Sequence, residues 1–226
     1  VGNRNLALRA GGTCGQSFVF GTGSSTCYLQ FECPTVTTYV MNGDIDGTRC
    51  GTLRAWCPNG LNVGSTVTFN GTIDCTGKTL DVQFYQTMTI NYNGAVKAAA
   101  VSGGGSVAGG SAWQRLYATG GDFAVGEWRP CYSSSLKAER DNVFGTTPGA
   151  LPRFLFDTGY AEATSDTATG LVDLNGHELT ADRVDSATTR TTIGRVQSST
   201  GHGRLVLRGS ADALTYALFE KNMDVV

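Results

Sequence analysis

The chain has 226 residues, a formal net charge of -2 and only 16% charged residues, so nothing in its charge points to nucleic acid or an anionic membrane as a partner. It has 31 glycines, 29 threonines and only 4 lysines, which disfavours a helical protein, and its 40% hydrophobic content disfavours disorder. These values predict one β-rich domain over residues 1–226. The apolar run at 95–101 is too short to span a bilayer, so no membrane insertion is expected.

Cysteines are concentrated in the first third of the chain. They number seven in all: Cys14, Cys27, Cys33, Cys50, Cys57 and Cys75, with Cys131 standing apart. One interpretation is an extracellular domain with disulfides among the first six, and the other is a protein with buried thiols made in a reducing compartment. The local concentration favours at least one disulfide. No C-x-x-C pair occurs and histidines number only two, so no metal site and no cofactor are predicted.

Short apolar or alternating runs predict strands throughout the chain, at 17–20, 26–31, 35–41, 66–69, 80–92, 122–128, 153–156, 170–174, 188–196 and 203–208. In the 80–92 run, Val82 and Met88 belong to different alternation patterns, which predicts a bulge near 85–87. The segment 210–221 fits a helix or a strand equally well. The pattern as a whole indicates little helix.

Asn-Gly pairs follow several of these runs. They are Asn42-Gly43, Asn59-Gly60, Asn70-Gly71, Asn93-Gly94 and Asn175-Gly176. Asn-Gly is typical of the type I′ turn of a two-residue β-hairpin. The predicted fold is therefore all-β, an antiparallel β-sandwich or β-barrel with long loops and little helix. The Gly-rich stretch 102–111 allows a domain boundary near 93–111, but one domain is favoured, and no internal repeat was detected.

No catalytic residues are predicted. His177 and His202 lie in expected turns, and the chain has no G-x-S-x-G sequence to supply a nucleophile. Glu127 stands beside Trp128 on an expected strand. That glutamate leaves a β-sandwich glycan hydrolase or lyase as a second alternative, although such enzymes normally use two carboxylates.

Candidate receptor- or glycan-binding residues lie between the third and fourth expected strands. They are Asp44 and Asp46 in NGDIDG, Trp56, and Asn59 after it. Exposed aromatic side chains can stack on sugars or anchor protein interfaces. Of the tryptophans, Trp56 is expected to be the most exposed and Trp128 to pack in the core. The two aspartates also fit ordinary turn chemistry.

The closing segment 188–226, TTRTTIGRVQSSTGHGRLVLRGSADALTYALFEKNMDVV, resembles the end of the capsid spike domain of astroviruses, of the avian type, and more distantly the protruding domain of hepeviruses. The resemblance implies a non-enzymatic β-barrel or sandwich spike on the virion surface. It also implies a homodimer that attaches to a host-cell receptor, protein or glycan, and displays epitopes for neutralising antibodies. The alternative is a secreted, extracellular carbohydrate-binding module or adhesin.

Overall fold

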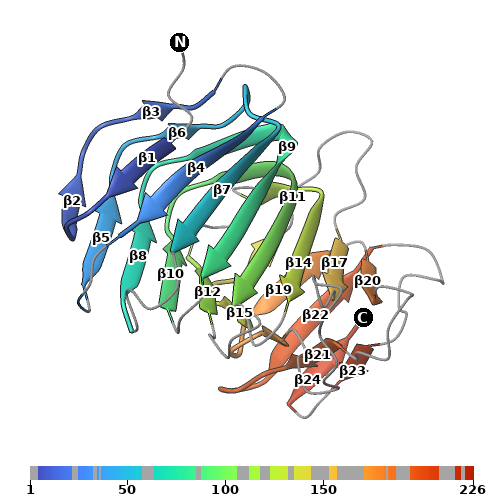
Figure 1. Ribbon diagram of the computed structural model, residues 1–226. Coiled ribbons are helices and arrows are strands. Elements are labelled where there is room, and N and C mark those ends of the chain that lie inside the picture. Colours follow the sequence, from blue (N-terminus) through green and yellow to red (C-terminus); the bar gives the residue numbers. More distant parts are fainter. Residues whose placement is uncertain are drawn as a thin grey trace, which may run out of the picture.

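The chain forms a coil of parallel strands in which each turn stacks on the one before (Figure 1). The computed structural model describes residues 5–21, 25–32, 35, 37–57, 64–84, 88–105, 112–117, 123–131, 135–143, 153–156, 171–181, 183–186, 194–208, 217–219 and 222–226. These residues contain strands and no helix, and every strand pairing among them is parallel. This arrangement is a β-solenoid.

Three sheets run along the coil. Sheet A contains β1 (Asn5–Leu8), β4 (Thr26–Phe31), β7 (Thr52–Cys57), β9 (Ile73–Phe84), β11 (Val96–Gly105), β14 (Glu127–Cys131), β17 (Arg153–Phe156) and β20 (Arg183–Ser186), joined at one corner by β3 (Phe18–Val19), β6 (Ile45–Asp46) and β13 (Phe123–Val125). Sheet B contains β2 (Gly12–Cys14), β5 (Thr38–Met41), β8 (Thr66–Phe69), β10 (Met88–Tyr92), β12 (Ala112–Leu116), β15 (Ser135–Ala138), β18 (Leu171–Asp173), β21 (Gly194–Gln197) and β23 (Ala217–Phe219). Sheet C contains β16 (Asn142–Val143), β19 (Glu178–Ala181), β22 (Gly203–Leu207) and β24 (Met223–Val225).

Residue alternation explains why these strands stack. In β4, β7 and β8 every second residue is buried, and the residues between them are more accessible. The inward residues of sheet B form a column through the core, in which Met41 lies beside Phe69 and Phe69 beside Tyr92. The rings of Phe69 and Tyr92 stack with centroids 5.9 Å apart. One turn buries little apolar area alone, so successive turns stabilise one another.

The predicted antiparallel sandwich or barrel is wrong. Alternation of inward and outward residues does not depend on strand direction, and a solenoid turn shows the same pattern as a hairpin strand. Strands that are consecutive in the chain do not pair with each other, and each pairs with strands of the neighbouring turns. The spike fold implied by the resemblance is wrong for the same reason.

The hairpin interpretation of the Asn-Gly pairs is wrong as well. Asn42, Asn70 and Asn93 each follow a strand of sheet B and stack on one another at the same corner. The Asn70 side-chain amide donates to Asn42 Oδ1 at 2.7 Å, and that of Asn93 donates to Asn70 Oδ1 at 2.8 Å. The pairs therefore make a ladder between turns.

Each glycine of this corner is needed because the neighbouring backbone is very close. A Cβ on Gly71 would lie 2.3 Å from the carbonyl oxygen of Gly43, and a Cβ on Gly94 would lie 2.2 Å from that of Gly71. Asn175 and Gly176 have φ angles of 50° and 81°, as in a type I′ turn. That turn nevertheless joins β18 of sheet B to β19 of sheet C, and Asn59-Gly60 lies outside the described residues.

The expected bulge in 80–92 is instead a passage between sheets: the run divides into β9 of sheet A and β10 of sheet B, with 85–87 outside the described residues. The expectation of no internal repeat is wrong at the level of structure, because each turn of the coil repeats the one before. Along sheet B one turn takes between 22 and 36 residues, and the residues at matching positions are too different for the repeat to be recognised from the sequence. The sheets continue on both sides of 93–111, where 102–105 belong to β11. Of 210–221, the described part 217–219 is a strand. In the described part of the chain, no helix is long and apolar enough to be a membrane span.

Candidate functional site

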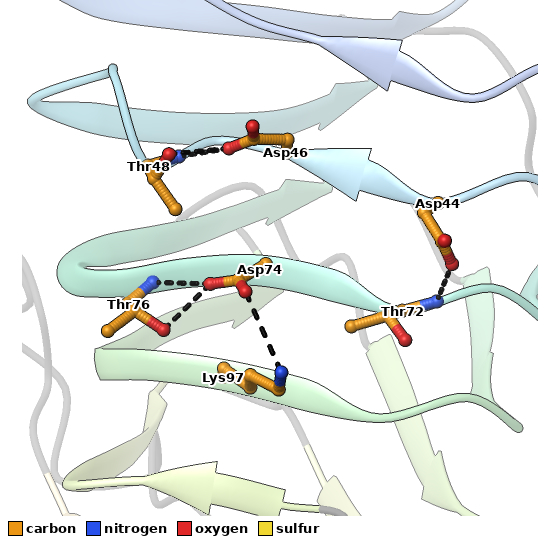
Figure 2. Close-up of polar contacts among 7 residues, drawn as sticks. All are labelled: Asp44, Asp46, Thr48, Thr72, Asp74, Thr76 and Lys97. Atoms are coloured by element: carbon orange, nitrogen blue, oxygen red, sulfur yellow. Dashed lines mark hydrogen bonds and ion pairs between the residues drawn. The ribbon is translucent and has the colours of Figure 1, made fainter.

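Two aspartates on neighbouring turns, Asp46 and Asp74, hold the same local structure at the corner of sheet A (Figure 2). Asp46 Oδ1 accepts hydrogen bonds from the backbone nitrogen and hydroxyl of Thr48, at 2.9 and 2.6 Å. Asp74 Oδ1 accepts the same pair from Thr76, at 3.0 and 2.7 Å. Lys97 of the next turn lies 3.7 Å from Asp74 Oδ2. In each D-x-T segment the aspartate and the threonine two residues later thus stabilise a tight bend of the backbone.

Asp44 links one turn to the next. Its Oδ1 accepts a hydrogen bond from the backbone nitrogen of Thr72 at 2.8 Å. Two hydrogen bonds lower the pKa of Asp46. The larger effect comes from the Thr48 hydroxyl and the smaller one from the Thr48 backbone nitrogen. Asp44 and Asp46 therefore have structural contacts, and a ligand-binding role for them stays a prediction.

The outer face of sheet A carries a regular grid of side chains on β4, β7 and β9. Its three columns follow the strand register, and we call them together the sheet A grid: Thr26, Thr52 and Thr79; Tyr28, Arg54 and Asp81; Gln30, Trp56 and Gln83. All are half-buried except Asp81, which is buried. With strands about 4.8 Å apart and same-face residues about 6.7 Å apart, the grid covers about 10 by 13 Å.

Arg54 organises the middle column of the grid. Its Nε lies 2.8 Å from Asp81 Oδ2, and its guanidinium carbon lies 5.7 Å from the centroid of the Tyr28 ring. Asp81 Oδ2 also accepts a hydrogen bond from the side-chain amide of Gln83 at 3.0 Å. The single positive and single negative charge of the grid thus neutralise each other while their positions are fixed.

Trp56 lies in the third column of the grid, between Gln30 of β4 and Gln83 of β9. Its ring packs against Tyr28 with centroids 6.1 Å apart and an angle of 60° between the planes. The two rings and three amide or guanidinium groups form one surface of apolar ring faces beside hydrogen-bonding groups. Such a surface is suited to a ligand that has both C–H and hydroxyl groups.

The structure separates the residues that the sequence proposed together. Trp56 belongs to the sheet A grid, Asp44 directly precedes β6, Asp46 is the last residue of β6, and Asn59 lies outside the described residues. Trp128 is 1% exposed, as predicted for a core residue. Glu127 is buried at the start of β14.

Metal-binding clusters of three or more His, Cys, Asp or Glu are absent from the described residues. Of the cysteines, Cys14, Cys27, Cys50 and Cys75 are free thiols in this structure.

Sequence reasoning missed Tyr28, Arg54, Asp81 and the glutamines of the grid. A signal was present in the hexapeptides TCYLQF at 26–31, TLRAWC at 52–57 and TLDVQF at 79–84. Each begins with threonine and buries its second, fourth and sixth positions where burial is described. Aligning these segments places their outward residues in register.

No family of known proteins, curated protein sequence or solved structure matches this chain.

Proposed function

We propose that the protein binds an uncharged oligosaccharide on the sheet A grid and does not cleave it. The observation that carries the proposal is the position of Trp56 and Tyr28, two accessible aromatic rings in contact on one face and surrounded by side chains that donate and accept hydrogen bonds. Sugar rings present C–H groups to aromatic faces and hydroxyl groups to amides and carboxylates. The grid offers both kinds of partner within one patch.

The charge of the grid selects the ligand class. Arg54 is paired with Asp81, so the patch has no unpaired cation with which to attract sulfated or uronic acid polymers. A partly buried ion pair of this kind often adds little net stability, because the cost of desolvating the two charges offsets their attraction, so folding alone gives little reason for it. It holds donors and an acceptor in fixed directions, which lowers the entropic cost of binding.

The same residues support the proposal of binding without cleavage. Glycosidases commonly use two carboxylates that flank the scissile bond, and the grid contains one, Asp81. Its Oδ2 accepts from both Arg54 and Gln83. The alternative of a hydrolase or lyase acting through Glu127 stays a prediction.

A glycan-binding face would serve a capsid spike that attaches to cells and equally a secreted adhesin. Both settings stay proposals, as do the homodimer and recognition by neutralising antibodies. Sedimentation velocity at high concentration tests the homodimer expected for a spike, and a strictly monomeric protein would count against it.

A glycan array tests the binding proposal, with neutral, sulfated and uronic acid oligosaccharides printed side by side. We expect neutral glycans to bind and Trp56→Ala to weaken that binding by about ten-fold or more, the loss typical of an interface hot spot. Tyr117→Ala is the matched control, because Tyr117 is also a half-buried aromatic residue but follows β12 of sheet B. Melting curves of both variants establish that they fold.

Three outcomes would refute the proposal. Wild-type protein that binds no neutral glycan removes its basis. Binding that Trp56→Ala and Tyr28→Ala leave unchanged places the ligand elsewhere. Exclusive binding of sulfated or uronic acid glycans contradicts the charge argument.

A further inference from the structure

Two buried cysteines on adjacent turns, Cys27 and Cys50, lie close together inside the coil. Cys27 is an inward residue of β4, and Cys50 lies in the turn just before β7. Their exposed fractions are 1% and 0%. The backbone nitrogen of Gly51 donates to the carbonyl oxygen of Ser25 at 3.0 Å, which brings the two turns together at this point.

Gly21 shows how near the two sulfur atoms are. It has a φ angle of 79°, and a Cβ placed on it would lie 2.7 Å from Cys27 Sγ and 3.0 Å from Cys50 Sγ. Both sulfur atoms therefore lie next to the position that a Cβ of residue 21 would occupy, and they can approach it because residue 21 is glycine. Burial, and after it a hydrogen bond to Cys27, raises the pKa of the Cys50 thiol.

A third buried thiol, Cys75, belongs to the following turn. Its sulfur atom borders a different glycine, since a Cβ on Gly47 would lie 2.8 Å from Cys75 Sγ. Burial raises the pKa of Cys75 to about 12. Cys75 also interacts electrostatically with the Cys50 thiol, so a Cys50–Cys75 bridge is the main competitor of a Cys27–Cys50 bridge.

We propose that Cys27 and Cys50 form a disulfide that links β4 to the turn before β7, made by exchange with a small disulfide of the glutathione class. The thiolate of one cysteine attacks the external disulfide, which forms a mixed disulfide and releases one small thiol. The second cysteine, as a thiolate, attacks the bound protein sulfur and releases the other small thiol. The two cysteines lose two protons and two electrons, and the external disulfide is reduced. Because both side chains are inaccessible in the finished coil, exchange takes place during folding.

Peptide mapping of the wild-type protein tests the pairing directly. Reduced, unfolded protein is refolded in a mixture of glutathione and its disulfide, remaining thiols are alkylated, and trypsin is added without reductant. Trypsin places Cys50 alone in CGTLR at 50–54, Cys27 in 10–49, and Cys57 with Cys75 in 55–78. We expect CGTLR linked to 10–49, and chymotrypsin then separates Cys27 from Cys14 and Cys33 in that peptide.

Alkylated Cys50, or CGTLR linked to 55–78, would overturn the proposal. Matched variants add a second readout on the refolded protein. Cys50→Ser should lower Tm by about 5–10 °C, because a bridge that closes a loop of this length constrains the unfolded chain. Cys75→Ser should keep the disulfide, so adding reductant should lower its Tm by a similar amount. If reductant leaves the Tm of both wild-type protein and Cys75→Ser unchanged, no stabilising bridge exists.

Discussion

The Asn-Gly corner predicts a large stability loss for a single methyl group, in the variant Gly71→Ala. Gly71 is the middle glycine of the corner, and its Cβ would lie 2.3 Å from Gly43 O and 2.9 Å from the backbone nitrogen of Asp44. Both atoms belong to backbone, which has no alternative rotamer. The two turns must therefore separate by about 1 Å at this point to reach an ordinary contact distance.

That separation has a calculable cost. The Asn70–Asn42 hydrogen bond of 2.7 Å and the Thr72–Asp44 hydrogen bond of 2.8 Å join the same two turns. A further 1 Å, approximately, takes both beyond hydrogen-bond distance. Overpacking costs about 1–3 kcal/mol, and each lost hydrogen bond costs about 1 kcal/mol. We expect Gly71→Ala to lower the free energy of unfolding by about 3–5 kcal/mol.

Urea unfolding followed by circular dichroism measures this loss. Gly15→Ala is the control, because a Cβ there has no atom within 4 Å. We expect the control to change the free energy of unfolding by less than about 0.5 kcal/mol. A Gly71→Ala protein within the same range of wild type would show that the turns are not held at this distance, and the ladder argument would fail.

Three further substitutions test single contacts by the same urea measurement. Asn70→Ala removes a donor to one ladder asparagine and an acceptor for the next, so we expect a loss of about 1–2 kcal/mol, and no loss would contradict the ladder. The Thr48 hydroxyl lowers the pKa of Asp46, so this carboxylate adds stability above its unfolded pKa of about 3.9 and loses it as the pH falls through the lower folded value. The stability difference between wild type and Asp46→Asn should therefore shrink in acid, and a constant difference would refute that coupling. Tyr92 is 1% exposed and its hydroxyl donates to Gln114 Oε1 at 3.1 Å, so Tyr92→Phe should cost about 1–2 kcal/mol, and an unchanged stability would show that this bond has no net value.

Strand positions could be predicted from the sequence, but their partners could not. The alternation of Cys27, Leu29 and Phe31 with polar or half-exposed residues correctly indicates a strand with one buried face. Which strand lies beside it depends on residues one full turn away. Asn-Gly after a strand then favoured the local solution, a hairpin, because hairpin pairing needs no long-range information. The predicted antiparallel fold is wrong because the hairpin interpretation assigned each strand a partner that is next to it in the chain.

The same Asn-Gly pairs contained the evidence against hairpins. The pairs at 42, 70 and 93 all follow a buried residue at the end of a strand of sheet B, Met41, Phe69 or Tyr92. A recurring strand end at solenoid spacing predicts stacking of like on like, in which each asparagine meets the next. The shared position of these pairs, and not their type, distinguishes a ladder from a series of hairpins.

The candidate site could be predicted only in part, for a related reason. Trp56 was identifiable as an aromatic residue near turn formers, but Tyr28 and Arg54 acquire their meaning from register. The solenoid makes most inward positions apolar, with a few hydrogen-bonded exceptions such as Gln114, and at its corners it repeats asparagine, glycine and D-x-T. Outward positions of sheet A follow no such rule: the threonine column is uniform, whereas Trp56 stands between two glutamines. Folding requires no particular side chain at these outward positions. Side chains that differ from strand to strand there are what we expect of a surface that binds a ligand.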